Sequence, residues 1–204
     1  MSDSVGKNLY DAADNGRVSE VSSLLRDNPD INVNWTSDSQ WTFLHTASRN
    51  GYVEVVKLLL AHPAIDVRVK NYIGQTPLSF ACEKGQVSVV ELLLKDPRVD
   101  VTLDDNDGRT PLWFASREGK HEVIEWFIAS GRDLGDVKNK KEKNWGEGKD
   151  YTALEIAREN KKAEVVSVLE KFLGNPAQTR QEIRQKLKFT GLSSSPFHFI
   201  SFWL

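Results

Sequence analysis

The chain contains one six-residue pattern four times, and this internal repetition constrains its fold more than any other feature. Each copy starts with threonine, has leucine at its third position and ends with alanine; the copies are Thr42–Ala47, Thr76–Ala81, Thr110–Ala115 and Thr152–Ala157. The threonines are 34, 34 and 42 residues apart. A period of this length predicts a stacked array in which each unit buries its apolar face against its neighbours.

A glycine follows each of the first three copies at a fixed distance, and an apolar run such as Val55–Leu60 comes after it. These glycines are Gly51, Gly85 and Gly119, and Gly16 ends an earlier, weaker copy that lacks the threonine. Glycine readily adopts the left-handed conformation that ends a helix and turns the chain back. The pattern therefore predicts five helix-turn-helix units, which begin near Lys7, Trp41, Gln75, Arg109 and Tyr151.

These units resemble ankyrin repeats, whose signature is Thr-Pro-Leu-His-x-Ala at a period near 33 residues. The resemblance runs from about Lys7 to Leu173 and implies an all-α solenoid of about five helix-turn-helix units. The implied repeat domain spans 1–174, with units at about 7–35, 36–70, 71–104, 105–138 and 151–174 and an insertion loop at 138–150. A basic helix and an apolar tail follow at 175–204.

Two departures from the family pattern carry expectations of their own. Only the second unit keeps the motif histidine, as His45, which in the family tends to bridge backbone groups of adjacent turns; the others carry Ser79, Trp113 and Glu155. We expect Trp113 to fill the space between repeats, the alternative being that it projects into the groove. Lys161 replaces the turn glycine of the last unit, which predicts a less regular turn there and a unit that caps the array.

In ankyrin stacks the turn tips and the outer face of each first helix line a concave groove that binds the partner. Trp, Tyr and Arg are the residues that most often anchor interfaces, so the preferred contacts are Trp41, Tyr72, Arg109, Arg117 and Tyr151. The alternative is that Trp41 and Tyr151 cover neighbouring turns as internal packing. Mapped onto this chain, the resemblance predicts a partner-binding set of Trp41, Arg49, Tyr72, Ile73, Gln75, Glu83, Lys84, Asn106, Asp107, Arg109, Arg117 and Tyr151.

Charge is distributed unevenly along the chain. The net charge is -2, and the insertion 138–150 carries +2 and the tail 175–204 carries +3, which leaves -7 on the repeat body. An acidic body argues against a nucleic-acid groove along the stack. The two basic segments are either solvated surfaces or partner contacts, and Trp145 in the insertion either folds back onto the stack or meets a partner.

The basic helix that begins near Asn175 could dock on the last unit as a cap, or lie on a partner or a membrane surface. The end of the chain, Pro196–Leu204, is apolar but too short to cross a bilayer. It is either a genuine hydrophobic motif or the product of truncation or alternative splicing.

No arrangement of residues predicts catalysis. The four histidines are spread along the chain, and Cys82 falls where the repeat needs a small buried residue. Phosphate-loop and metal-ligand motifs are missing from the sequence. We therefore expect no enzymatic activity, no metal and no cofactor. The single cysteine excludes an internal disulfide, and the start of the chain does not resemble a signal peptide. We therefore expect the protein in the cytosol or nucleus, and we also expect it to be a monomer.

The sequence thus predicts a non-catalytic scaffold for protein-protein interaction, an adaptor or an inhibitor, that binds a protein partner on the concave face of its repeats. The alternative is a membrane-associated regulator that its basic and aromatic C-terminal tail holds at lipid, with membrane contact through that tail only. Neither hypothesis identifies the partner.

Overall fold

The protein is described by a computed structural model that covers residues 2–138, 140–143 and 149–188. The expectations for Trp145 and for Pro196–Leu204 fall outside these residues. Within them, five helical hairpins follow one another along the chain. Their helices are α1 (Ser2–Asp14) and α2 (Val18–Asp27), α3 (Phe43–Asn50) and α4 (Val53–Ala61), α5 (Pro77–Lys84) and α6 (Val87–Lys95), α7 (Pro111–Glu118) and α8 (His121–Ser130), and α9 (Ala153–Glu159) and α10 (Ala163–Gly174).

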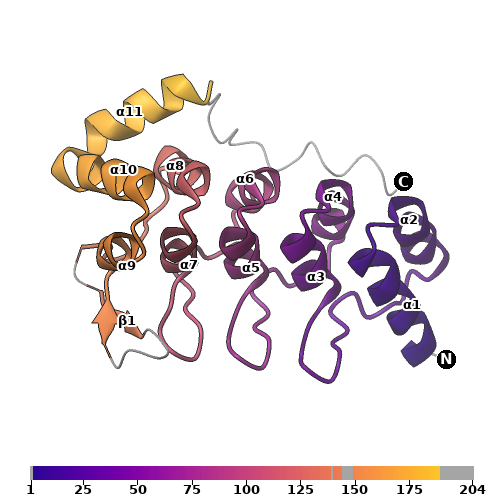
Figure 1. Cartoon of the computed structure of the whole chain (residues 1–204). Helices are drawn as coiled ribbons and strands as arrows, with labels where there is room; N and C mark the ends of the chain where they lie inside the picture. Colours follow the sequence, from indigo (N-terminus) through magenta and orange to yellow (C-terminus); the bar gives the residue numbers. More distant parts are fainter. Residues whose placement is uncertain (1, 139, 144–148, 189–204) are drawn as a thin grey trace.

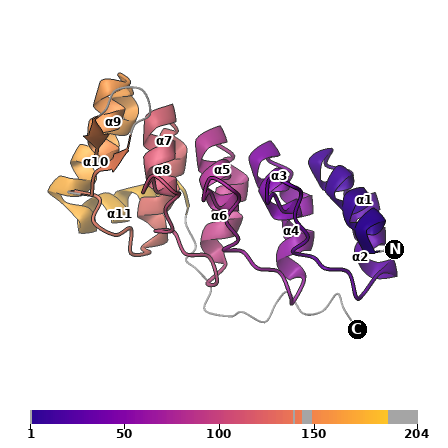
Figure 2. The same ribbon diagram turned by 90° about the horizontal axis from the view of Figure 1, so that it is seen from below.

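The hairpins stack in single file as two layers of helices. The first helices α1, α3, α5, α7 and α9 contact one another in sequence order, and the second helices form a parallel row (Figures 1 and 2). The long connections between hairpins project from the row of first helices (Figure 1). This arrangement confirms the predicted all-α repeat solenoid.

The threonine of each motif forms the N-cap of the helix that follows it. The hydroxyl oxygens of Thr42, Thr76, Thr110 and Thr152 each accept a hydrogen bond from the backbone amide three residues later. This bond satisfies one of the amides that a helix N-terminus leaves unpaired. The repeated threonine therefore sets where each of these first helices begins.

The turn within each hairpin has the predicted left-handed residue. Gly51 and Gly85 have φ values of 79° and 73°, and the next amide, on Tyr52 or Gln86, reaches back to the helix. The expected irregularity of the last turn is partial: Lys161 adopts a left-handed φ of 55°, but α9 is one residue shorter than α3, α5 and α7, and its C-cap Asn160 is not left-handed. Its turn forms the same bond, from Lys162 N to Ala157 O at 2.8 Å, as Gln86 N forms to Ala81 O at 2.9 Å.

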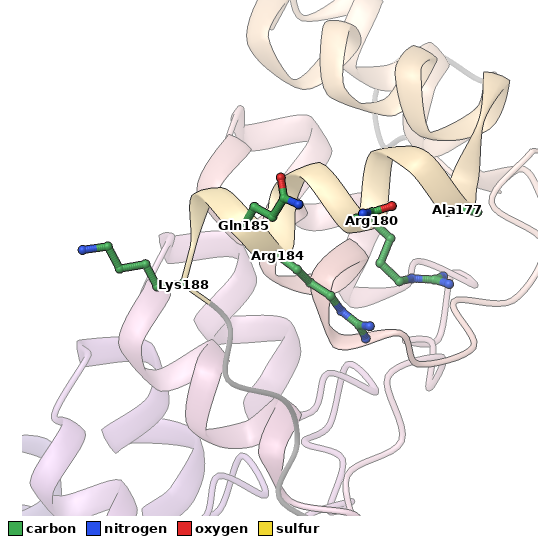
Figure 3. A pocket seen from close by; sticks show the side chains of 6 residues that line it. Ala177, Arg180, Arg184, Gln185 and Lys188 are labelled. Carbon is green, nitrogen blue, oxygen red and sulfur yellow. The ribbon is translucent and has the colours of Figure 1, made fainter.

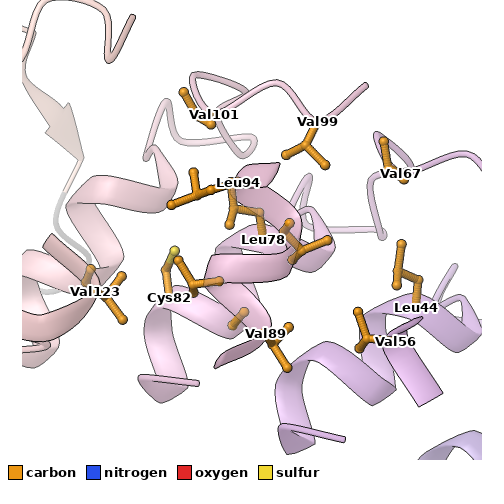
Figure 4. Packing of buried hydrophobic residues seen from close by; sticks show 14 of the residues in the cluster. Leu44, Val56, Val67, Leu78, Cys82, Val89, Leu94, Val99, Val101 and Val123 are labelled. Atoms are coloured by element: carbon orange, nitrogen blue, oxygen red, sulfur yellow. The ribbon is translucent and has the colours of Figure 1, made fainter. Parts of the chain in front are cut away.

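Apolar side chains from both layers form a core that is continuous along the array. Figure 4 shows one part of it, where Leu78 of α5 and Leu94 of α6 lie near Val99 of the next connection. Cys82 belongs to this core with 0% exposure, and burial raises the pKa of its thiol well above its usual value. The thiol is therefore a packing group, as predicted.

Trp113 fills space between repeats, as expected, and its side chain is fully buried. Its ring lies 5.6 Å from that of Phe114 in an edge-on arrangement, and Ile156 of the next hairpin belongs to the same cluster. The fourth and fifth hairpins are therefore joined by a small aromatic cluster that is separate from the main core.

The insertion between α8 and α9 contains a short antiparallel pair of strands. Strand β1 (Glu142–Lys143) pairs with β2 (Asp150–Tyr151), with Glu142 opposite Tyr151. The pair lies beside α9, on the side of the projecting connections (Figure 1). The insertion thus returns the chain directly to the N-cap of α9.

Helix α11 (Pro176–Lys186) lies across α8 and α10 (Figure 1). Ile183 is buried in this contact, and the Nε atoms of Arg180 and Arg184 donate to the carbonyl oxygens of Ile128 and Ala129 at 3.1 and 2.7 Å. Cations are favourable at a helix C-terminus, where carbonyl groups are left unpaired. Of the alternatives for this helix, the structure shows docking on the array.

Candidate protein-interaction face

The predicted site residues lie on one side of the array, which we call the loop face. It consists of the helices α3, α5, α7 and α9 and of the connections that lead into them, residues 34–42, 68–76, 102–110 and 149–152. These connections project beyond the first helices and follow one another along the array (Figure 1).

Hydrogen bonds between neighbouring connections tie their tips together. Tyr72 N donates to Ser39 O at 3.4 Å, and Asn106 N donates to Ile73 O at 3.1 Å. The Asn106 side chain also donates to Tyr72 O at 3.0 Å. Because these bonds join the first three tips, this part of the loop face is held in one arrangement before any partner arrives.

Each tip is also held from within by one polar side chain. Asn71 Oδ1 accepts from the amides of Ile73 and Gln75 at 3.2 and 3.0 Å. Gly74 completes this tip with a φ of 82°, and a Cβ atom there would lie 2.6 Å from Asn106 N. A larger residue would therefore force neighbouring tips apart.

The tip residues Tyr72 and Ile73 present apolar surface. The Tyr72 side chain is 62% exposed, and apart from Val18 it is the only large hydrophobic residue in this exposed class among the described residues. Ile73 beside it is half-buried, Asn106 on the next tip is exposed and Asp107 is half-buried. An exposed aromatic ring on a braced tip suits the role of an interface anchor.

Gln75 and Arg109 do not offer the surface that the sequence predicts for them. Gln75 is 4% exposed and Arg109 is 7% exposed. The Arg109 guanidinium donates to Asp105 Oδ2 at 2.8 Å from Nε and to Asp107 Oδ2 at 3.0 Å from Nη2. Both residues hold their own tip together, because a buried arginine with two carboxylate partners is a structural group. They are corrections to the predicted set.

Trp41 packs against the next hairpin and is also partly exposed on the loop face. Its ring centroid lies 4.3 Å from that of Phe80 on the next hairpin, and the ring is half-buried. The Arg49 guanidinium lies 5.9 Å from the indole centroid, within the range of a cation-π contact. Phe80 was not among the predicted site residues. Its position as an aromatic residue in fifth place of the motif is the sequence feature that could have indicated this contact.

A second pair of this kind lies two hairpins away. The Arg117 guanidinium is 5.7 Å from the Trp113 centroid, and its Nε is 3.1 Å from Glu118 Oε1. Between the two pairs, Lys84 Nζ bonds Glu83 Oε1 at 2.7 Å. The helical part of the loop face therefore alternates arginine-tryptophan pairs with an ion pair.

Tyr151 lies at the far end of the loop face and is half-buried. It packs against the cluster of Trp113, Phe114 and Ile156. This contact supports the alternative interpretation, internal packing, although the residue is partly exposed.

A second polar surface lies on α11, away from the loop face. An open depression there is lined by the side chains of Arg180, Arg184 and Lys188, with Gln181 and Gln185 between them and Ala177 at one end (Figure 3). The acidic residue of this helix, Glu182, faces α10 instead, where it forms an ion pair with Lys171. The exposed face of α11 is thus basic.

The buried histidine of the second repeat, His45, stabilises the fold through hydrogen bonds. His45 is fully buried, and desolvation lowers its pKa to about 4, so the ring is neutral near pH 7. Its Nδ1 faces the Thr42 amide at 3.1 Å and its Nε2 lies 3.0 Å from Gln75 O, which is the bridge between adjacent turns that the resemblance implies. Within residues 2–138, 140–143 and 149–188 no three His, Cys, Asp or Glu residues gather as metal ligands.

The helices that the structure describes are all too short or too polar to span a bilayer.

Comparison with known proteins agrees with this architecture. A family model described as "Ankyrin repeats (3 copies)" matches residues 9–105 and 66–138, which together cover more than half of the chain. A search of curated proteins found no match. Ankyrin repeats are generally modules of protein-protein interaction and are typically non-catalytic. From its matched repeats and its stacked helical hairpins, the chain belongs to the ankyrin-repeat family.

Proposed function

We propose that the protein is a non-catalytic scaffold, an adaptor or an inhibitor, that binds a protein partner in the cytosol or nucleus through its loop face. The observation that carries this proposal is the Tyr72 side chain, 62% exposed on a tip that hydrogen bonds hold on both sides. A large exposed ring on a preorganised support gains contact area with little loss of conformational entropy.

The flanking residues support the same assignment. Arg49 lies over Trp41 on the hairpin before Tyr72, and Arg117 lies over Trp113 on the hairpin after it. Stacked arginines keep hydrogen-bond donors available to a partner while their planes are held in place. We propose Tyr72, Arg49 and Arg117 as the central contacts. The remaining members of the proposed surface are Trp41, Ile73, Glu83, Lys84, Asn106, Asp107 and Tyr151.

The test compares proteins captured by the full chain with those captured by a variant carrying Tyr72→Ala and Arg49→Glu. Both substitutions lie on exposed side chains, so the array keeps its core and caps. Arg109→Glu is unsuitable, because it would break the buried pair with Asp105 and disturb the tip itself.

The matched control is Arg26→Glu on α2, which makes the same change of charge on a side chain that is 71% exposed and lies outside the loop face. We expect specific partners to be lost with the loop-face variant and retained with the control. Equal capture by both variants and the wild type contradicts the proposal.

A second candidate function, a membrane-associated regulator, has support from the basic face of α11. Each basic residue near an anionic bilayer contributes about 1 kcal/mol. Ile183 is buried against the array, so this helix would contact lipid through its charges and not through an inserted apolar face.

Sedimentation with vesicles rich in phosphatidylserine tests this candidate on the full chain. The comparison uses wild type, Lys188→Glu with Gln185→Glu, and a chain that ends at Lys188. Loss of vesicle binding in either variant supports the membrane candidate, and a wild type that stays in the supernatant overturns it.

A further inference from the structure

The helix that follows a motif threonine leaves the backbone amide of that threonine unpaired, so the amide can donate to a side-chain acceptor. In the second repeat the Thr42 amide donates to His45 Nδ1 at 3.1 Å, and in the fifth the Thr152 amide donates to Glu155 Oε2 at 2.8 Å. In both repeats the acceptor is the side chain three residues later, so the helix caps itself. A helix N-terminal amide that is buried without an acceptor is destabilising by about 1–3 kcal/mol.

The fourth repeat cannot cap itself in this way. Trp113 occupies the position of His45, and an indole is a hydrogen-bond donor without an acceptor atom. Its side chain is fully buried among Phe114 and Ile156, so it contributes to packing. The Thr110 amide, which is also buried, needs an acceptor from another part of the chain.

Glu142 of the insertion occupies that place. Its Oε1 atom accepts from the Thr110 amide at 3.2 Å, although the two residues are 32 positions apart. The Glu142 side chain is 3% exposed, which is exceptional for a glutamate in a surface insertion. Pairing of β1 with β2 fixes its backbone at the edge of the array.

We propose that Glu142 acts as the positioning residue of the fourth repeat, replacing the motif histidine as acceptor for the N-cap of α7, so that Trp113 and the insertion depend on one another. The insertion then stabilises the fourth repeat, because it provides the acceptor for the Thr110 amide. A tryptophan at the motif position is tolerated because the insertion returns an acceptor to the cap.

The surroundings of Glu142 make this contact sensitive to protons. Among the described residues its second oxygen, Oε2, is buried without a hydrogen-bond partner. Asp105 on the preceding tip opposes a negative charge there, whereas Lys140 of the insertion favours it. Desolvation is the largest effect and raises the pKa of Glu142 to about 7.

Several other charged groups near the contact between Glu142 and Thr110 form ion pairs of their own. Lys140 Nζ bonds Asp104 Oδ2 at 3.1 Å, and Arg109 pairs with Asp105. Asp136 lines the small space beside Glu142, and Lys141 Nζ lies 3.8 Å from Glu155 Oε1 on α9. The hydrogen bond from Thr110 favours the carboxylate, but desolvation outweighs it, so burial of Glu142 against the array becomes less favourable as the pH rises from 4.5 to about 7.

Hydrogen exchange of the Thr110 amide, measured on the full chain, tests the proposal. Glu142→Ala should raise its exchange rate about tenfold or more, because the amide loses its acceptor. The Thr42 amide should keep its rate. Lys141→Ala, which removes an exposed side chain from the same insertion, serves as the matched control and should leave both amides unchanged.

Rescue separates this role from general packing. In a Trp113→His plus Glu142→Ala variant, the new histidine offers the acceptor that His45 offers to Thr42, and Thr110 should regain protection. Because the loss of Trp113 can unfold the array, Glu142→Gln provides a second measurement. Its amide oxygen still accepts the hydrogen bond, so the protection of the Thr110 amide, which is its exchange rate corrected for the intrinsic pH dependence of exchange, should stay close to wild type and no longer change between pH 4.5 and 7. Unchanged Thr110 exchange in Glu142→Ala overturns the proposal.

Discussion

The second and fourth repeats start with the same threonine cap, and they differ in the side chain that accepts from its amide. In the second repeat the acceptor is His45, three residues later, and in the fourth it is Glu142, which is 32 residues later. The first arrangement is local and leaves the repeat self-sufficient. The second leaves the motif position to a buried tryptophan and makes the cap depend on the insertion. The comparison teaches that one repeat position can exchange hydrogen bonding for packing when a distant segment supplies the lost acceptor.

The largest expected effect comes from Trp113→Ala. Removing this fully buried ring leaves a cavity between the fourth and fifth repeats, and we expect the free energy of unfolding to fall by about 3–5 kcal/mol. Urea denaturation of wild type and variant measures the change. A loss below about 1 kcal/mol would mean that the ring contributes little packing, and the contrast between the two repeats would fail.

His45 should make the second repeat sensitive to acid. Burial lowers its pKa from 6.5 to about 4, so the unfolded chain binds the proton more tightly than the folded one between these values. The free energy of unfolding therefore falls as the pH falls from 6.5 to 4, by at most roughly 3 kcal/mol. His45→Gln should flatten this part of the stability profile. An equally steep decline in the variant would assign it to another group.

Glu142 should act in the opposite direction. Its pKa is raised from 4.5 to about 7, so the folded chain binds the proton more tightly in that window. Stability is then lost as the pH rises from 4.5 to 7. We expect a smaller effect of about 1 kcal/mol, because the insertion can separate from the array before the array unfolds. The same denaturation series on Glu142→Gln checks this, since the neutral amide should remove the decline between pH 4.5 and 7.

The smallest expected change in the free energy of unfolding concerns the turns within the hairpins, where the fourth and fifth hairpins differ. Lys161 holds a φ of 55° at the position that Gly119 occupies with a φ of 74°. Lys161→Gly should raise the free energy of unfolding by about 0.5–1 kcal/mol, because only glycine adopts this conformation without strain. Gly119→Ala should lower it, since the added Cβ atom would also lie 2.8 Å from the Lys162 side chain. Thermal melts of the two variants should shift in opposite directions.

The repeat period and the local signals were sufficient to predict the array. Thr42 and Thr76 cap their helices, Gly51 and Gly85 turn the hairpins, and Trp113 fills the space between repeats, each as the residue type requires. Caps and turns depend on interactions between residues a few positions apart, and packing between repeats depends on the constant spacing of the repeats. Residue chemistry and spacing are therefore enough to predict them.

The features that the sequence did not reveal depend on contacts between distant segments or on a choice between similar conformations. Arg109 is buried because Asp105 and Asp107 fold around it, whereas its residue type favours an exposed position. Lys161 adopts the left-handed conformation that its residue type disfavours, in the turn across which α9 packs against α10. Glu142 reaches Thr110 only after the insertion returns to the array, and a charged insertion gives no sequence signal of a buried acceptor.

The most direct test of the two capping arrangements follows the backbone amide chemical shifts of Thr42 and Thr110 by NMR as the pH changes. Each amide reports the protonation of its own acceptor, so Thr42 should titrate with a midpoint near pH 4 and Thr110 with a midpoint near pH 7. The Thr110 transition should disappear in Glu142→Gln while that of Thr42 remains. A Thr110 amide that does not titrate between pH 5 and 8.5, or that titrates unchanged in Glu142→Gln, would contradict the account.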